Sequence, residues 1–207
     1  YRTDLLQKHG FPDPPATWDE LTTMAEAIVS AERRSGNSTL WGYVFQGRAY
    51  EGLTCNALEW QVAESGGRIV EADGHVAVNT PGAIRAFDRA ASWVGNISPP
   101  GVTMYAEEEV RQMFQTGNAV FMRNWPYAFS LVNGENSPVA GNVKTAPLPA
   151  GPGGSATTLG GWQLAVSKYS RKQEAATAFV RFMAGAHVQK QQALGASRLP
   201  TITALYD

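Results

Sequence analysis

The helical spacing of apolar residues is clearest between residues 17 and 34, where one side of the segment is apolar and the other is polar. This is the pattern of an amphipathic helix that buries one face. Thr17 and Glu20 have the T-x-x-E spacing of a capping box, which satisfies two free backbone amides at a helix start. The sequence therefore predicts a helix from Thr17 to about Arg34. Its apolar face contains Leu21, Met24, Ala25 and Ile28.

The same spacing predicts five further helices along the chain. Thr80 and Pro81 are a favourable N-cap and first helical residue for one of them. Ser170 and Gln173 repeat the capping-box spacing before another, which is expected to end at Gly185. A helix in the second half of residues 47–67 is expected to bury Leu53, Ala57, Leu58 and Val62. The remaining two are predicted in residues 107–117 and 187–195.

Short runs rich in aromatic and β-branched residues separate these helices and are typical of strands. The predicted strands are residues 41–46, 119–122 and 162–167, with an extended segment at 143–149. Asp73 and Gly74 lie between two alternating segments, 68–71 and 75–78, which predicts a β-hairpin. Strands that alternate with helices indicate an α/β fold with partly parallel pairing. In such a sheet, ligands bind beyond the strand ends.

The composition is that of an ordinary globular protein and excludes several classes of partner. Of 207 residues, 43% are hydrophobic and 17% are charged, and the net charge is −1. This balance gives no basic surface for nucleic acid or for an anionic membrane. No window approaches the roughly 18 apolar residues of a membrane span. Six Trp and seven Tyr in a chain with few charges suit a protein that grips amphipathic small molecules.

Motifs for metal, cofactor or nucleophilic chemistry are absent from the sequence. Cys55 is the single cysteine, and the three histidines lie far apart without a second ligand at metal-binding spacing. The glycine-rich run at 150–161 lacks the GK[ST] of a phosphate-binding loop, and neither G-x-S-x-G nor a Cys-His signature occurs. We therefore predict no metal, no cofactor and no catalytic residue.

The run Glu107, Glu108 and Glu109 has two interpretations. Acids in the first turn of a helix complement its dipole, which is the ordinary role of such a run. The alternative is that Glu107 turns into a cleft. A glycoside hydrolase would need a second acid across the scissile bond, and the sequence shows no such pair.

The segment from Gly117 to Phe129 places bulky polar and aromatic side chains where a short strand gives way to a helix that starts at a proline. These side chains are Arg123, Asn124, Trp125 and Tyr127. One interpretation is a surface that receives a ligand, because binding residues gather at the ends of elements. The other is that Trp125 and Tyr127 only cap a core, since aromatic residues dominate cores as well as sites.

Several motifs, in this order, resemble the extracellular solute-binding proteins of carbohydrate ABC importers, and most closely their trehalose- and maltose-binding branch. The motifs are YRTDLLQKHGF, PPATWDEL, the region of Tyr50 and Glu51, GGRIV, AEEEVRQMFQTGNAVFMRNWPYAF, APLP, LGGWQLAVS and RLPT. The resemblance covers nearly all of the chain. The combination of FQTGNAVFMRNWPYA with GGW is its most specific part.

The resemblance implies an α/β fold of the periplasmic-binding-protein-like type, class II, in which two lobes close on a sugar. The chain then holds one lobe plus the returning segment of the other. We expect residues 1–142 to be the C-terminal-type lobe and residues 143–207 to be the returning segment of the N-terminal-type lobe. The hinge strands are expected near 143–149 and 196–202, and the leading lobe is expected to lie outside this chain.

By the same resemblance, Trp125 and Tyr127 match the aromatic platform of the family, and Gly161 with Trp162 match a contact from the opposite lobe. Glu107, Tyr50 and Glu51 match positions that hydrogen-bond sugar hydroxyls, and Arg123 or Asn124 offer further polar groups to a sugar rim. The implied protein is extracytoplasmic and non-catalytic. It binds a disaccharide, trehalose or a related α-glucoside, delivers it to permease subunits, and meets the membrane only through a lipid anchor outside this chain.

Two other hypotheses stay open at the level of the sequence. A carbohydrate-active enzyme could use the same aromatic platform, in which case sugar is converted rather than only bound. A partner-docking domain could use Trp125 and Tyr127 as core residues, in which case no sugar would bind.

Overall fold

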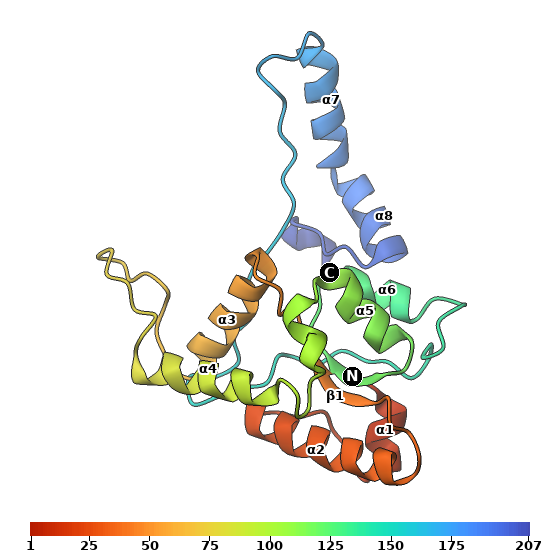
Figure 1. Cartoon of the computed structure of the whole chain (residues 1–207). Helices are drawn as coiled ribbons and strands as arrows, with labels where there is room; N and C mark the ends of the chain where they lie inside the picture. Colours follow the sequence, from red (N-terminus) through yellow and green to blue (C-terminus); the bar gives the residue numbers. More distant parts are fainter. The chain divides into compact units, whose positions relative to one another are not determined.

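A computed structural model describes residues 1–207 and divides them into two compact units. Unit 1 comprises Tyr1–Trp125 and Val132–Thr158, and unit 2 comprises Pro126–Leu131 and Leu159–Asp207. Figure 1 labels the elements of both. Unit 1 contains α1 (Thr3–Lys8), α2 (Trp18–Arg34), β1 (Trp41–Val44), α3 (Glu51–Ala63), α4 (Pro81–Trp93), η1 (Pro100–Met104), α5 (Glu107–Gln115) and β2 (Ala119–Met122). The chain continues with α6 (Tyr127–Val132), α7 (Gln173–Met183), α8 (Ala186–Ala196) and η2 (Thr203–Leu205).

The sheet of unit 1 consists of β1 and β2, which pair in parallel with Trp41 opposite Ala119 and Val44 opposite Met122. The predicted parallel pairing is confirmed, although β1 ends at Val44 and not at Gln46. Because the strands are parallel, the residues after Val44 and after Met122 leave the sheet at the same edge. The backbone amide of Arg123 still donates to the carbonyl of Val44, at 3.0 Å.

The core of unit 1 is built around a cluster of aromatic rings from α2, β1, the residue after β1, α3 and α4. Neighbouring ring centroids lie 5.2 to 6.2 Å apart, in tilted or edge-to-face arrangements that aromatic quadrupoles favour. Its members are Trp18, Tyr43, Phe45, Trp60 and Trp93. Half of the tryptophans are therefore buried core residues. The prediction that the tryptophans serve a ligand can therefore apply only to the other three.

Two of the three predicted caps are confirmed. The amide of Glu20 donates to Thr17 Oγ1 at 3.1 Å, and Glu20 Oε2 accepts from Ala16 at 2.7 Å. Thr80 Oγ1 accepts from the amide of Ala83 at 3.2 Å at the start of α4. The predicted cap at Ser170 is wrong, because its hydroxyl accepts from the amide of Lys172 in the preceding turn and α7 begins only at Gln173.

Two predicted strand regions differ from the structure. The segment 162–167 is extended but forms no strand, since no other segment of residues 1–207 pairs with it. The predicted hairpin forms its turn, with Glu71 donating to His75 at 2.8 Å and Ala77 donating to Ile69 at 2.9 Å, but only one antiparallel bridge, Val70 with Val76.

Helix α3 buries a different face from the one that the apolar spacing predicted. The predicted residues Leu53, Ala57, Leu58 and Val62 are only half-buried. The buried face instead contains Gly52, Cys55, Asn56, Glu59, Trp60, Gln61 and Ala63. Polar side chains can occupy that face because each finds a hydrogen-bond partner there, as a buried polar group requires.

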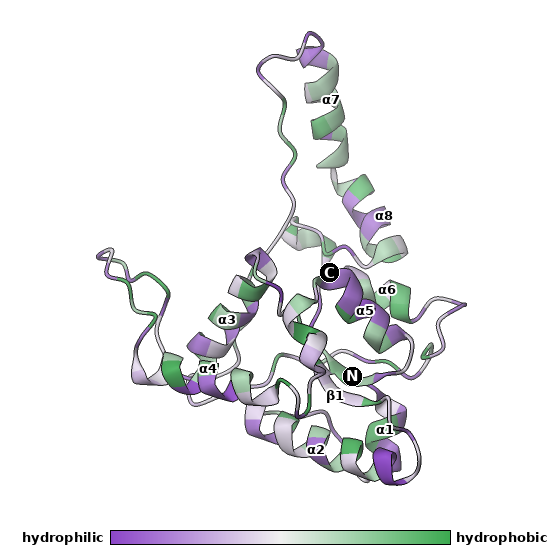
Figure 2. Cartoon of the chain, viewed as in Figure 1, coloured by the Kyte–Doolittle hydropathy of each residue, from purple (hydrophilic) through white to green (hydrophobic).

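Unit 2 has no buried core of its own. No residue of α7 or α8 is buried, and Figure 2 nevertheless colours much of α7 as hydrophobic. Phe179 and Phe182 of α7 are 57% and 64% exposed. The apolar face of α7 therefore has no cover within unit 2.

Candidate functional site

The candidate site of unit 1 lies where β1 and β2 end. Gln46 follows β1, and the chain then reaches Tyr50 at the start of α3. Arg123, Asn124 and Trp125 follow β2 directly. The parallel pairing therefore brings two segments that are far apart in the sequence to one edge of the sheet, where ligands of open α/β sheets bind.

Trp125 is half-buried and fixed on several sides. Its indole Nε1 donates to Glu107 Oε1 at 3.2 Å, and its backbone amide donates to Asn124 Oδ1 at 2.8 Å. The guanidinium carbon of Arg123 lies 4.1 Å from the centroid of the indole, within the range of a cation–π interaction. The ring is therefore held in one orientation with part of its surface open to solvent.

Glu107 differs from its two acidic neighbours in what it contacts. Glu109 accepts from the amide of Ala106 and so caps α5, and Glu108 forms an ion pair with Arg111 at 2.6 Å. Glu107 instead turns to Trp125, and its backbone carbonyl accepts from Asn124 Nδ2 at 3.0 Å. Glu108 and Glu109 thus fill the helix-start role predicted from the sequence, whereas Glu107 contacts the aromatic ring. That Glu107 faces a cleft stays a prediction.

Tyr50 lies beside this carboxylate. Burial, followed by the nearby Glu107 carboxylate, raises the pKa of the Tyr50 hydroxyl. The hydroxyl is therefore protonated at neutral pH and has no well-aligned hydrogen-bond partner within residues 1–207. A phenol next to a carboxylate pairs a donor with an acceptor, but the buried Tyr50 oxygen is not exposed to a ligand in this structure.

Glu51 is exposed at the first position of α3. Its Oε1 accepts from the thiol of Cys55 at 3.3 Å. Burial, and then this hydrogen bond, raise the pKa of Cys55 to about 11. Glu51 follows Tyr50 directly in the sequence, but its carboxylate accepts a hydrogen bond from the Cys55 thiol.

The prediction that Arg123 offers hydrogen bonds to a ligand does not fit its position. Arg123 is 4% exposed, and its Nε and Nη2 donate to Glu59 Oε2 and Oε1 at 3.0 and 2.6 Å. Its Nη1 donates to Gln46 Oε1 at 3.3 Å. Asn124 likewise uses both ends of its amide within its own turn and toward Glu107. Both residues hold the site rather than face out of it.

Glu59, Gln46 and Asn56 are the polar residues that the sequence interpretation missed. All three are buried, and Asn56 Nδ2 donates to the backbone carbonyl of Gln46 at 3.0 Å. Thr158 adds its backbone amide to Glu59 Oε1 at 3.0 Å. The signal was available in the spacing of Asn56 and Glu59, which share one face of a helix whose apolar pattern is weak.

Three predicted site residues belong to unit 2. Tyr127 is half-buried at the start of α6, and Gly161 and Trp162 are exposed in the extended segment before α7. Trp125 belongs to unit 1, and its predicted pairing with Trp162 across a cleft stays a prediction.

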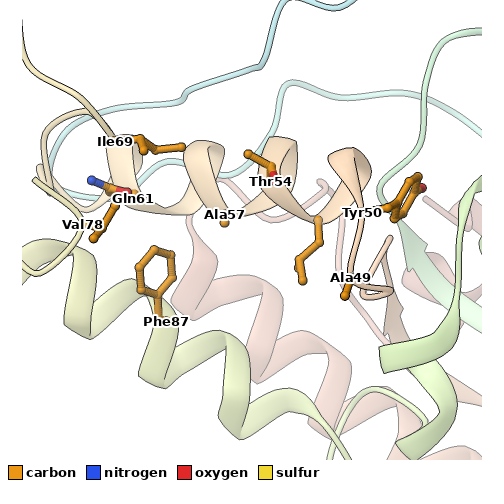
Figure 3. Close-up of a pocket in the computed structure, with 9 residues that line it drawn as sticks. Ala49, Tyr50, Thr54, Ala57, Gln61, Ile69, Val78 and Phe87 are labelled. Atoms are coloured by element: carbon orange, nitrogen blue, oxygen red, sulfur yellow. The ribbon is translucent and has the colours of Figure 1, made fainter. Parts of the chain in front are cut away.

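A groove of about 450 Å³ lies between α3, α4 and the turn that follows α3 (Figure 3). Phe87 of α4 points toward α3 there, and Ile69 and Val78 come from the turn. Its one amide, Gln61 Nε2, already donates to the carbonyls of Gly66, Arg68 and Ala77. Such an apolar wall offers little to a hydroxyl-rich ligand, so the edge near Trp125 is the better candidate.

Residues 1–207 contain no group of three or more potential metal ligands. None of the helices has both the length and the hydropathy needed to cross a bilayer.

Comparison with known proteins decides the family. The model of the bacterial extracellular solute-binding protein family matches residues 1–190. The chain belongs to this family. A probable ABC transporter-binding protein of Deinococcus radiodurans is 52% identical over all 207 residues, which are 49% of its length.

Solved structures of sugar-bound proteins are also similar to the chain. Maltose-bound MalE3 of T. maritima matches with a TM-score of 0.92 and 44% identity over the whole chain, which covers 52% of MalE3. The GacH receptor of Streptomyces glaucescens, solved unliganded and with acarbose, matches with a TM-score of 0.81 and 28% identity. This match covers the whole chain and 50% of GacH.

These matches establish the α/β, periplasmic-binding-protein-like fold. The chain spans about half the length of the relatives that it matches. The relatives are binding proteins of ABC transporters, not enzymes, so the prediction that the protein is not an enzyme is confirmed and the alternative of a carbohydrate-active enzyme is not supported.

Proposed function

We propose that the full-length protein is the extracytoplasmic substrate-binding subunit of an ABC sugar importer. It binds a disaccharide, trehalose or a related α-glucoside, between two lobes and delivers it to the permease subunits. The observation that carries the proposal is the Trp125 indole, which is fixed in orientation with the Glu107 carboxylate at its edge.

The chemistry of a pyranose fits this arrangement. One face of the sugar ring is lined by C–H groups and stacks on an indole, while its hydroxyl rim needs polar partners. A carboxylate accepts hydrogen bonds from two hydroxyls at once and forms stronger bonds than a neutral acceptor. In the proposed site, Trp125 and Tyr127 supply the stacking surface, and Glu107, Tyr50 and Glu51 supply the polar rim.

The opposite lobe is proposed to contribute Gly161 and Trp162. We assign residues 1–142 to the C-terminal-type lobe and 143–207 to the returning segment of the other, with hinge strands near 143–149 and 196–202. Asn124 and Arg123 act by holding Trp125. The maltose bound to MalE3 and the acarbose bound to GacH, both α-glucosides, support this class of ligand for our chain.

The affinity that such a protein needs indicates that both lobes take part. A micromolar dissociation constant corresponds to about 8 kcal/mol. One stacked ring and a few hydrogen bonds to exposed groups supply only part of that, so closure of two lobes is required. The motif resemblance also implies a lipoprotein of the mycobacterial trehalose-recycling kind, with the anchor outside this chain.

Isothermal titration of the full-length protein with trehalose, maltose and sucrose tests the proposal. We expect saturable heat with trehalose or maltose, and recovery of the same sugar unchanged after prolonged incubation. Lactose, a β-linked disaccharide, is the matched control and is expected to bind at least tenfold more weakly. Absence of heat with all of the α-linked sugars would overturn the proposal, and release of monosaccharide would favour an enzyme.

A further inference from the structure

The indole of Trp125 rests on a buried ion pair. Arg123 and Glu59 have 3% and 0% of their side chains exposed, and two parallel N–H···O bonds join them. This fork fixes the plane of the guanidinium, which lies 4.1 Å from the indole centroid. One face of the indole is therefore covered by Arg123, and a sugar can stack only on the other.

Other polar groups complete the surroundings of the pair. Gln46 Oε1 accepts from Arg123 Nη1, and Gln46 Nε2 donates to the backbone carbonyl of Arg123 at 3.1 Å. Glu59 Oε1 also accepts from the amide of Thr158. Thr158 is the last residue of unit 1 before the chain enters unit 2. The Glu59 carboxylate thus contacts both Arg123, which packs on Trp125, and Thr158, the last residue of unit 1 in that segment.

Stability alone does not account for such a pair. Removing two charges from water costs more than their attraction commonly returns, and apolar replacements of buried pairs are often neutral or stabilising. A pair that fixes one geometry can be retained for specificity instead, and here the geometry that it fixes is that of the aromatic platform.

We propose that Glu59 and Arg123 are positioning residues for the sugar-stacking face of Trp125. This inference rests on the proposed function. Arg123 holds the covered face of the indole by a cation–π contact, Glu59 fixes the guanidinium, and neither touches the sugar. Replacing Glu59 therefore weakens binding through the orientation of Trp125.

The chain offers a control at Glu64, the residue that follows α3. Glu64 is 5% exposed and forms an ion pair with Arg89, and none of its recorded contacts is with Trp125. Glu59→Gln leaves the buried Arg123 without its carboxylate, and Glu64→Gln leaves Arg89, whose side chain is 17% exposed, with only the Asp19 carboxylate at 3.7 Å. Full-length variants are compared by thermal unfolding, by isothermal titration with the sugar that binds the parent best, and by near-ultraviolet circular dichroism.

We expect Glu59→Gln to weaken sugar binding at least tenfold and to change the tryptophan region of the circular dichroism spectrum. Glu64→Gln is expected to lower the melting temperature comparably and to leave affinity within threefold of the parent. In a Trp125→Phe background, Glu59→Gln should no longer change the tryptophan signal. Equal loss of affinity in both Gln variants, or an unchanged spectrum in Glu59→Gln, would overturn the inference.

A second variant covers the case in which Glu59→Gln does not fold. Glu59→Gln combined with Arg123→Gln removes both charges and keeps amide groups that hydrogen-bond. We expect this double variant to fold and to keep both the weakened binding and the altered spectrum. Affinity and spectrum equal to the parent would contradict the inference. The spectra require no sugar, so they test the positioning of Trp125 even if the parent binds none and the proposed function fails.

Discussion

The role of a single residue in the site depends more on the residues that it contacts than on its own chemical type. Arg123 at a strand end is suited to bind a ligand, but Glu59 draws its guanidinium into the core. Cys55 and Glu51 are one helical turn apart, and their hydrogen bond makes the thiol a poor nucleophile. The roles of Arg123 and Cys55 thus follow from the carboxylates of Glu59 and Glu51, which contact them.

The thiol of Cys55 is expected to react slowly in the folded protein. Its pKa is raised to about 11, so little thiolate exists at pH 8, and the side chain is buried. Labelling with a disulfide reagent at pH 8 should be at least tenfold slower than in the guanidinium-unfolded chain. Glu51→Gln removes a charge that disfavours the thiolate and should speed labelling. A folded thiol that reacts as fast as the unfolded one would contradict this picture.

Among the elements, α1 and α2 show how a charged contact joins two helices. Lys8 and His9, at the end of α1, both contact Glu32 Oε1 near the end of α2, at 2.6 and 2.7 Å. Hydrogen bonds from Lys8 and then His9 lower the pKa of Glu32, whose side chain is 6% exposed. The carboxylate therefore favours the folded state only while it is ionised.

The contribution of Glu32 is expected to disappear in acid. Because the folded-state pKa is lowered, the stabilisation is full above the unfolded value of about 4.3 and is lost as the pH falls through the folded value. Glu32→Gln should lower the melting temperature by a constant amount above pH 5, and the difference should narrow below pH 4. Asp13→Asn, on the exposed connector, is the control. A difference independent of pH would refute the linkage.

The elements also show what the sequence can and cannot predict. Helix α2 follows its apolar spacing and its cap because one side packs on the core and the other faces water. Helix α3 does not, since Glu59 and Asn56 face inward to partners on other segments. Glu59 and Arg123 are 64 residues apart, and no local pattern records such a pairing. Segment 162–167 has strand composition, but a strand also needs a neighbour.

At the scale of the whole molecule, the two units differ in how much buried core stabilises them. Unit 1 has the aromatic cluster and the parallel strands, whereas α7 and α8 of unit 2 contain no buried residue. Local stability follows buried apolar contacts, so the two units are expected to open with different free energies.

Amide hydrogen exchange tests this difference in the 207-residue chain. We expect amides of α7 and α8 to exchange at least a hundredfold faster than those of α2, whose buried residues include Leu21 and Ile28. In the full-length protein, protection of α7 would show that its apolar face is covered there. Exchange from α7 as slow as from α2 in the 207-residue chain would contradict the expectation.

The central claim is that a sugar stacks on Trp125, and titration of Trp125 variants of the full-length protein tests it most directly. Loss of the ring removes stacking and apolar contact worth on the order of 2–3 kcal/mol. We predict that Trp125→Ala weakens binding of the preferred α-glucoside by roughly 30-fold to 150-fold. Trp125→Phe should stay within about tenfold of the parent, and both variants should melt as the parent does. A folded Trp125→Ala variant that binds as tightly as the parent would contradict the account.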